Sequence, residues 1–206
     1  IGFITSNFNI RQDANDTVYL AVAEKSVTRA PNVYIYEWPT LKLYRILRKG
    51  TEKGYACVQF SPHRPHEMAT LGRSPDYLLS VWDWKQEQLL LKCKAYGQDV
   101  FRVKWGQFDG QIITSGSGHI RFWNVAETFT GLKLQGYIGK FGQVDLSDVH
   151  GFVELPDGKV LSGSEQGVLL LWESNVIKCE LYRFDEDSTD PENQDMLKCH
   201  DGGLSW

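Results

Sequence analysis

Short apolar runs separated by turn residues form the repeating pattern of this chain. Four of these runs end in an aromatic residue followed by an acid or an amide, and they cover residues 33–38, 79–84, 120–125 and 169–173. Their aromatic residues, spaced by 46, 41 and 49 positions, are Tyr36, Trp82, Trp123 and Trp172. A period in the forties with an aromatic–acid dipeptide is typical of a propeller blade built from four strands.

The rest of each period also fits a four-stranded blade. A strand of small and apolar residues precedes each aromatic–acid run, at 20–23, 68–71, 112–115 and 160–163. Before it, alternating strands are expected at 55–60, 101–105 and 151–155. A last strand follows the dipeptide at 41–47, 88–93, 132–137 and 176–182. No segment repeats apolar residues with a helical period over three turns, so no long helix is expected.

These patterns resemble the WD-repeat family over nearly the whole chain. The best match is residues 161–173, which resemble the family's small-residue strand, hairpin turn and Trp-Asp strand. The resemblance implies structural blade positions at Tyr36, Trp82, Asp83, Trp123, Ser162 and Trp172. The family's buried tetrad joins a histidine, a turn aspartate, a strand Ser or Thr and the tryptophan. Only His200-Asp201 echoes the histidine here, so packing is expected to carry more of the stability.

The repeat arithmetic predicts an all-β fold, a partial WD-repeat propeller. A period of about 45 residues gives four blades and a remainder in 206 residues. Propellers have four to eight blades, and those with this repeat most often have seven. We expect blades at about 17–50, 51–98, 99–147 and 148–185 of a larger ring. Residues 186–206 are expected to lead into the next blade.

Composition narrows the classes of partner. The formal net charge of −4 and the pI near 5.7 argue against binding of nucleic acid, which needs a strongly basic surface. No run approaches 18 apolar residues, so no membrane partner is expected. The stretch 185–195 has six acids and no base. Such a run most often forms a disordered insertion. The alternatives are a docking loop for a basic partner and a phosphorylation site at Ser188 or Thr189.

Candidate chemistry in the chain is sparse. His63, His66 and Glu67 have the residue types of a metal site, but a solvated, proline-rich loop is the favoured interpretation. The glycines around Lys140 lack the Ser or Thr and the helix of a phosphate loop. We therefore expect no metal, no cofactor and no catalytic constellation, hence no enzyme. The candidate partner contacts are Trp84, just past a strand end, and Arg48 and Lys49 in a basic loop.

A closer resemblance is carried by residues 44–56, 75–84, 98–103 and 129–142. These strings resemble the cilia- and flagella-associated WD-repeat proteins of the axoneme, and the Trp-Asp-Trp-Lys turn is similar to the echinoderm microtubule-associated protein-like family. The resemblance implies a non-catalytic scaffold in the axonemal cytoskeleton that supports cilium motility. Its implied partners are inner-arm dynein, the doublet microtubule and other axonemal WD-repeat tether subunits. The alternative is a general cytosolic WD-repeat adaptor, such as a substrate receptor or trafficking scaffold.

Overall fold

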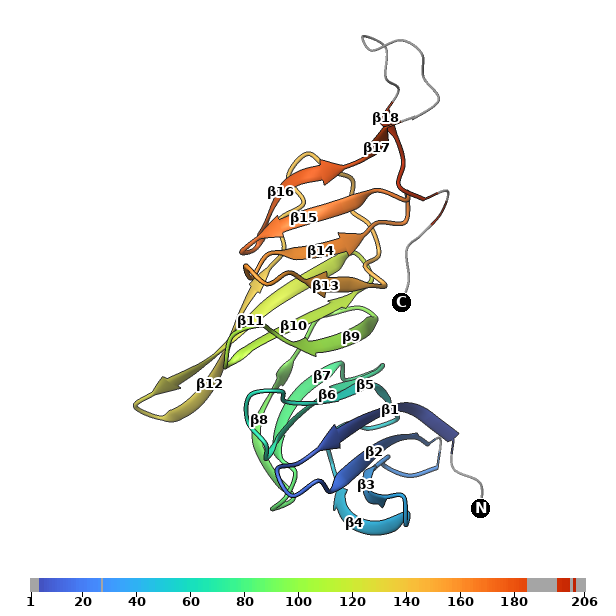
Figure 1. Cartoon of the computed structure of the whole chain (residues 1–206), viewed down its shortest axis with the longest axis vertical. Helices are drawn as coiled ribbons and strands as arrows, with labels where there is room; N and C mark the ends of the chain where they lie inside the picture. Colours follow the sequence, from blue (N-terminus) through green and yellow to red (C-terminus); the bar gives the residue numbers. More distant parts are fainter. Residues whose placement is uncertain (1–3, 27, 185–195, 201, 203–206) are drawn as a thin grey trace.

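The described part of the chain is built from β-strands (Figure 1). The computed structural model describes residues 4–26, 28–184, 196–200 and 202. The strands are β1 (Ile4–Gln12), β2 (Val18–Lys25), β3 (Val33–Trp38), β4 (Lys42–Leu47), β5 (Tyr55–Phe60), β6 (Glu67–Gly72), β7 (Leu78–Asp83), β8 (Gln88–Lys94), β9 (Val100–Trp105), β10 (Gln111–Gly116), β11 (His119–Thr128), β12 (Gly131–Ile138), β13 (Phe152–Glu154), β14 (Val160–Gly163), β15 (Leu169–Glu173), β16 (Val176–Leu181), β17 (Arg183–Phe184) and β18 (Met196–Leu197).

Four antiparallel sheets of four strands each form successive blades. Each sheet keeps its strands in chain order, β1–β4, β5–β8, β9–β12 and β13–β16, and β17 pairs with β18. We number these sheets blades 1 to 4, and they follow one another along the long axis of the molecule (Figure 1). The predicted all-β propeller fold is confirmed. The acidic stretch 185–195 lies outside the described residues.

Blade 1 contains a strand that the sequence did not suggest. The expected first blade began near residue 17, whereas β1 starts at Ile4 and pairs with β2. Polar residues interrupt its apolar pattern because Asn7 and Asn9 point toward blade 2. Their side-chain oxygens accept hydrogen bonds of 3.0 Å from the backbone N–H groups of Val58 and Phe60.

A shared irregularity marks the aromatic position of three blades. The register with the outermost strand shifts immediately before Tyr36, Trp82 and Trp172. This supports the equivalence of Tyr36 with the tryptophans. Blade 3 differs, because β11 pairs with β12 without a shift from Arg121 to Thr128. Its hairpin therefore continues past the sheet and projects from the molecule (Figure 1).

The apolar core lies between the blades. One buried cluster joins blades 1 and 2, a second joins blades 2 and 3, and a third joins blades 3 and 4. The second strand of each sheet supplies small side chains, such as Ala21 and Ala69, both fully buried. Small residues there let neighbouring sheets approach, and burial of both sheet faces explains the near-continuous apolar runs.

In the described part of the chain, no blade lies against one face of blade 1. Phe8 and Ile10 of β1 are 65% and 60% exposed, and Leu20 and Tyr36 on the adjoining strands are half-buried. The corresponding faces of the other blades are covered by the preceding sheet. An uncovered apolar sheet face of this kind is consistent with a partial propeller.

Candidate functional site

The strand-end tryptophans of blades 2, 3 and 4 make the same contact, each within its own blade. Trp82, Trp123 and Trp172 are almost completely buried. Each indole N–H donates to a hydroxyl on the neighbouring second strand, at 2.8–2.9 Å, and the acceptors are Thr70, Thr114 and Ser162. Each acceptor lies two residues beyond the residue opposite the tryptophan. Within the described residues, this pair corresponds to the Ser or Thr and the tryptophan of the tetrad that the family resemblance implied.

Blade 1 lacks that pair. Tyr36 takes the place of the tryptophan, and Val22 occupies the hydroxyl position. Both side chains are half-buried. Blade 1 therefore has neither the Ser or Thr hydroxyl nor the indole N–H of the pair, and the phenol of Tyr36 is partly open to solvent.

Asp83, the acid of the Trp-Asp dipeptide, stabilises the turn between β7 and β8. Its side-chain oxygen accepts a 3.0 Å hydrogen bond from the backbone N–H of Gln86. The residue is 9% exposed. Asp83 thus closes the turn locally, as aspartate commonly does.

Trp84 was a candidate partner contact because of its place just past a strand end, but the structure buries it. Its side chain is fully buried, with ring centroids of Tyr19, Tyr44 and Phe60 at 4.9, 6.0 and 5.3 Å. Two of these three rings come from blade 1, which covers the strand end. Trp38 occupies the equivalent place in blade 1 and is 53% exposed, because no sheet covers it.

The other two predicted contact residues lie at the solvent. Arg48 is 57% exposed and forms a loose 3.7 Å ion pair with Glu87. Lys49 is exposed, with a φ of 64°. Its backbone carbonyl accepts a 3.4 Å hydrogen bond from Lys92. Their contact with a partner stays a prediction.

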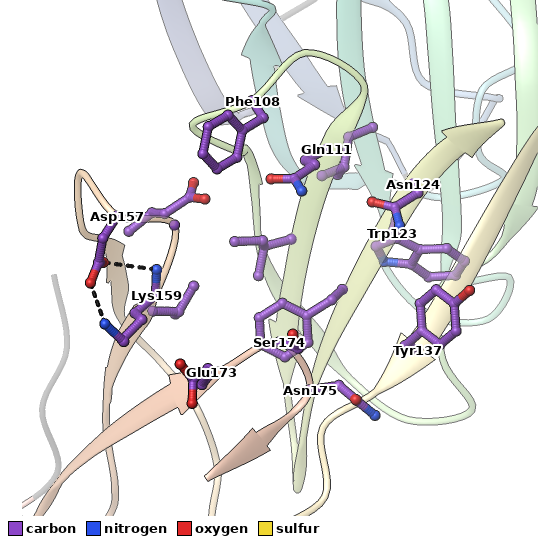
Figure 2. Close-up of a pocket in the computed structure, with 16 residues that line it drawn as sticks. Phe108, Gln111, Trp123, Asn124, Tyr137, Asp157, Lys159, Glu173, Ser174 and Asn175 are labelled. Atoms are coloured by element: carbon purple, nitrogen blue, oxygen red, sulfur yellow. Dashed lines mark hydrogen bonds and ion pairs between the residues drawn. The ribbon is translucent and has the colours of Figure 1, made fainter. Parts of the chain in front are cut away.

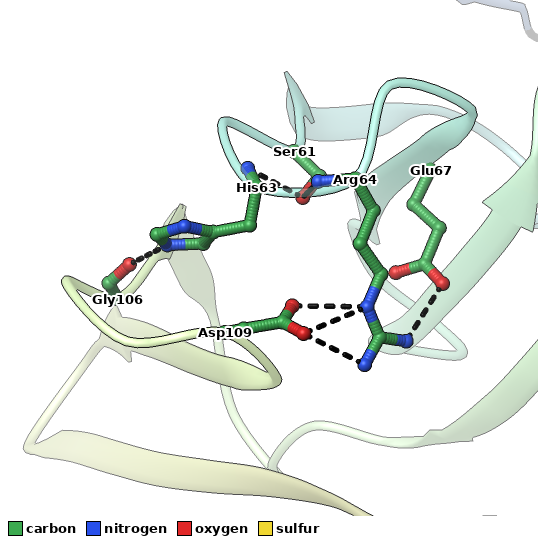
Figure 3. A network of polar contacts seen from close by, with 6 residues as sticks. All are labelled: Ser61, His63, Arg64, Glu67, Gly106 and Asp109. Atoms are coloured by element: carbon green, nitrogen blue, oxygen red, sulfur yellow. Dashed lines mark hydrogen bonds and ion pairs between the residues drawn. The ribbon is translucent and has the colours of Figure 1, made fainter.

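The loop 61–67 is a contact between blades 2 and 3. Figure 3 shows Arg64 reaching Asp109, with its guanidinium nitrogens 2.9–3.1 Å from the carboxylate oxygens. The same guanidinium donates to Glu67 at 3.0 Å. His63 Nε2 lies 2.8 Å from the carbonyl oxygen of Gly106. Hydrogen bonding to Arg64 lowers the pKa of the Asp109 carboxyl.

This arrangement uses the residues that sequence inspection considered for a metal site. His63 turns toward a backbone carbonyl, and Glu67 pairs with an arginine. Within the described residues, no group of three or more His, Cys, Asp or Glu side chains is placed to hold a metal ion.

Similar polar contacts connect every pair of neighbouring blades. On the same side, Arg11 of β1 donates to the carbonyl of Ser61, and the backbone N–H of Gln107 donates to Glu154 at 2.5 Å. We call these contacts and those of Arg64 and His63 the inter-blade clasp. The innermost strands are bridged as well: Trp105 donates to Gln59 at 3.0 and 3.1 Å, Arg102 to His150 at 3.1 Å, and Lys104 to Phe152 at 3.1 Å.

A cleft of about 530 Å³ opens between blades 3 and 4 (Figure 2). Residues of the β9–β10 turn and β11 line one side. The β13–β14 and β15–β16 turns line the other. Its lining includes Phe108, Gln111, Asn124, Glu154, Asp157 and Glu173.

Neither the clasp nor the cleft was visible in the sequence. Arg64 and Asp109 are 45 positions apart, and Glu154 is separated from Gln107 by 47. Each of these residues lies in or next to a turn, and the polar composition of a turn predicts only that its side chains are exposed to solvent. The one available signal was the blade period itself, which places equivalent turns side by side.

The sheets, the hydroxyl–tryptophan pairs and the inter-blade core define a WD-repeat β-propeller segment. A crystal structure of the Myceliophteria thermophila Cps50 (Swd1) β-propeller domain superimposes on it with a TM-score of 0.73. The match covers 100% of this chain and 60% of that chain, at 12% identity, so it concerns the fold alone. No protein-family model matches the sequence.

The sequence resembles cilia- and flagella-associated protein 44. Identity is 51% over 190 residues with the protein of Chlamydomonas reinhardtii and 52% over 188 residues with that of Mus musculus, covering 90% and 91% of this chain. The chain spans about a tenth of each of these curated relatives. Echinoderm microtubule-associated protein-like 4 of Homo sapiens is 30% identical over 72% of this chain and 15% of its own length. These likenesses indicate a protein of the cilium or flagellum with microtubule-associated relatives.

The described residues contain no helix that is both long and apolar enough to span a bilayer.

Proposed function

We propose that this chain is part of a non-catalytic axonemal scaffold that tethers inner-arm dynein to the doublet microtubule. The observation that carries the proposal is the likeness to cilia- and flagella-associated protein 44 over 90% of the chain. The names of the microtubule-associated relatives support a position close to the microtubule. Other axonemal WD-repeat tether subunits are the further partners that we propose.

The way in which the blades are joined supports a mechanical role. A tether has to keep its shape under load, and the weakest planes of a propeller lie between its blades. Here each such plane has a buried apolar cluster and polar bonds of the inter-blade clasp on one side. Separating two blades would expose the apolar area of the buried cluster and break the polar bonds of the clasp at once, and both changes cost free energy.

The side chains best suited to chemistry also support a non-catalytic role. His63 and Glu67 are engaged in contacts between and within blades. His119 is fully buried, and its ring stacks on Tyr96 at a centroid distance of 3.8 Å. Burial lowers the pKa of the His119 imidazole. A neutral, stacked imidazole in the core stabilises packing and has no access to a substrate.

We propose sequence repeat units at about 17–50, 51–98, 99–147 and 148–185, with 186–206 leading onward, although the sheet of blade 1 also contains β1 (Ile4–Gln12). We extend it to the whole protein by proposing that further blades complete the ring. We also propose Arg48 and Lys49 as contacts to a partner, because both are exposed cations on one rim.

The test is a rescue experiment in cells with motile cilia from which the gene for this protein has been deleted. The full-length wild-type protein should restore tether density in cryo-tomograms and a normal waveform. An Arg48→Glu/Lys49→Glu variant should be retained less in the axonemal fraction. A Lys133→Glu/Lys140→Glu variant is the matched control, since it makes the same change in net charge at two exposed cations away from blades 1 and 2.

Two results would overturn the proposal. One is a uniform distribution in the cytosol, which favours a general WD-repeat adaptor. The other is normal dynein-head position, tether density and beating in the null cilia. In either case the propeller fold would stand and the axonemal role would not.

A further inference from the structure

The cleft between blades 3 and 4 has the dimensions of a binding site. Its volume of about 530 Å³ lies within the range of roughly 300–1,000 Å³ found for ligand sites. It is bounded by turns of two different blades, so its two walls are fixed by separate sheets (Figure 2). Sites held by rigid sheets keep their geometry before a partner arrives, which lowers the cost of binding.

Aromatic side chains are left open in this cleft. Phe108 is 54% exposed and Tyr137 is 43% exposed. Phe108 comes from the β9–β10 turn, and its ring lies against Gly158 in the next blade. A Cβ at Gly158 would stand 2.9 Å from a ring carbon, and this glycine has a φ of 82°. The position of the ring thus depends on a glycine that the β13–β14 turn itself requires.

The lining of the cleft has more acidic than basic side chains. Glu154, Asp157 and Glu173 face a single basic residue, Lys159. Asp157 is paired with Lys159, and Glu173 accepts a 2.9 Å bond from Lys178 outside the lining.

Glu154 differs from the other two acids. It accepts one hydrogen bond, from the backbone N–H of Gln107, and it has no ion pair with any described residue. Burial raises the pKa of its carboxyl. A partly buried carboxylate without a cation is unfavourable by itself and becomes favourable when a cation arrives.

Two side-chain amides complete the lining. Gln111 and Asn124 lie on the blade 3 wall (Figure 2). Neither makes a side-chain hydrogen bond to another described residue. An amide offers both a donor and an acceptor, which matches the N–H and C=O groups of an extended peptide.

We propose that this cleft docks a basic peptide segment of a partner protein, whose arginine or lysine side chain meets Glu154 beside the ring of Phe108. The carboxylates favour a positively charged side chain of the peptide, and the aromatic ring adds a cation–π attraction to it. The amides of Gln111 and Asn124 hydrogen-bond the backbone of the peptide. The acidic stretch 185–195 of a second copy is disfavoured, because like charges would meet. The inference goes beyond the axonemal role, since the cleft would bind such a segment in any compartment.

The test uses the immobilised full-length protein and pools of short peptides with randomised neutral flanks. The pools share a fixed central arginine, lysine, citrulline or glutamate. The arginine and lysine pools should be retained, and the citrulline pool, which keeps the shape without the charge, should not. For the tightest arginine peptide, Glu154→Gln should weaken binding about tenfold, the worth of one charged hydrogen bond. Phe108→Ala should weaken it as well.

Glu52→Gln is the matched control, because Glu52 is an exposed carboxylate in the loop between β4 and β5 whose side chain makes no hydrogen bond or ion pair with a described residue. It should leave the affinity unchanged. Equal retention of the citrulline pool, preference for the glutamate pool, or no retention of any pool would overturn the proposal. So would equal affinity for the wild-type protein and Glu154→Gln. These outcomes concern the cleft only, so they leave the rescue test of the axonemal role independent.

Discussion

Replacement of Trp172 tests whether the strand-end tryptophans stabilise the blades as the structure indicates. The side chain is fully buried in the cluster between blades 3 and 4. Its ring meets Phe141 edge-on at 5.1 Å, and its indole N–H donates to Ser162 at 2.8 Å. Trp172→Ala removes the ring and the donor together. We expect a loss of about 3–5 kcal/mol, as for other buried aromatic residues changed to alanine.

The two contributions can be separated. Trp172→Phe keeps most of the apolar contact and removes the N–H group, so the hydroxyl of Ser162 loses its donor. We expect a cost of about 1–2 kcal/mol. In a double-mutant cycle, Ser162→Ala in the Trp172→Phe background should cost little, and the coupling energy should be about 1 kcal/mol.

The assay is urea unfolding of the complete propeller of the full-length protein, followed by far-UV circular dichroism. The dependence on urea should keep its slope, because an unchanged slope means that stability and not compactness has changed. Trp38→Ala is the matched control, since this tryptophan is 53% exposed, and it should cost less than about 1 kcal/mol. Equal losses at Trp172 and Trp38 would show that the assignment of blade positions is wrong.

Three further predictions concern the clasp, the cleft and the open face. Arg64→Ala should lower stability at neutral pH by more than the roughly 0.5–1 kcal/mol of a partly exposed pair, because it also leaves the buried carboxylate of Glu67 without its cation. Since Arg64 lowers the pKa of Asp109, this stabilisation is present above the unfolded pKa of about 4 and is lost as the pH falls through the folded pKa. Glu154→Gln should raise the urea midpoint at pH 7. Burial raises the folded pKa of Glu154, so its favourable contribution exists at acidic pH and disappears as the pH rises through that pKa. The 206-residue segment alone should self-associate in light scattering, and Phe8→Ser with Ile10→Ser should reduce this.

Each of these has a result that would count against it. A cost of Arg64→Ala that is the same at acidic and neutral pH would exclude the ion pair as its cause. A Glu154→Gln protein less stable than wild type at pH 7 would mean that the carboxylate is well compensated. Unchanged self-association of the Phe8→Ser/Ile10→Ser segment would show that a different surface mediates the association.

The blade repeat was predictable from the sequence because it depends on local patterns. Strands with alternating and small residues, and an aromatic residue before each turn, recur at a near-constant period. The positions Trp82, Trp123 and Trp172 followed from this period, and the structure places all three in the core. The strand β1 was not predicted, because polar residues interrupt its apolar pattern. Two of them, Asn7 and Asn9, accept hydrogen bonds from blade 2, and this contact cannot be read from the local sequence.

The two tryptophans just past a strand end show what local pattern could not decide. Trp38 and Trp84 have the same place in their repeats, yet one is 53% exposed and the other is fully buried. The difference arises from blade 1, whose Tyr19 and Tyr44 cover Trp84. Burial of such a residue depends on the neighbouring sheet and not on its own strand.

The candidate sites were decided in the same way. Arg64 meets Asp109, and Glu154 enters the cleft, only because turns from successive blades lie side by side. The sequence by itself determined the repeat, the strands and the aromatic positions within each blade. The tertiary structure alone decided which faces are covered and which charged side chains meet, because both depend on contacts between residues more than 40 positions apart.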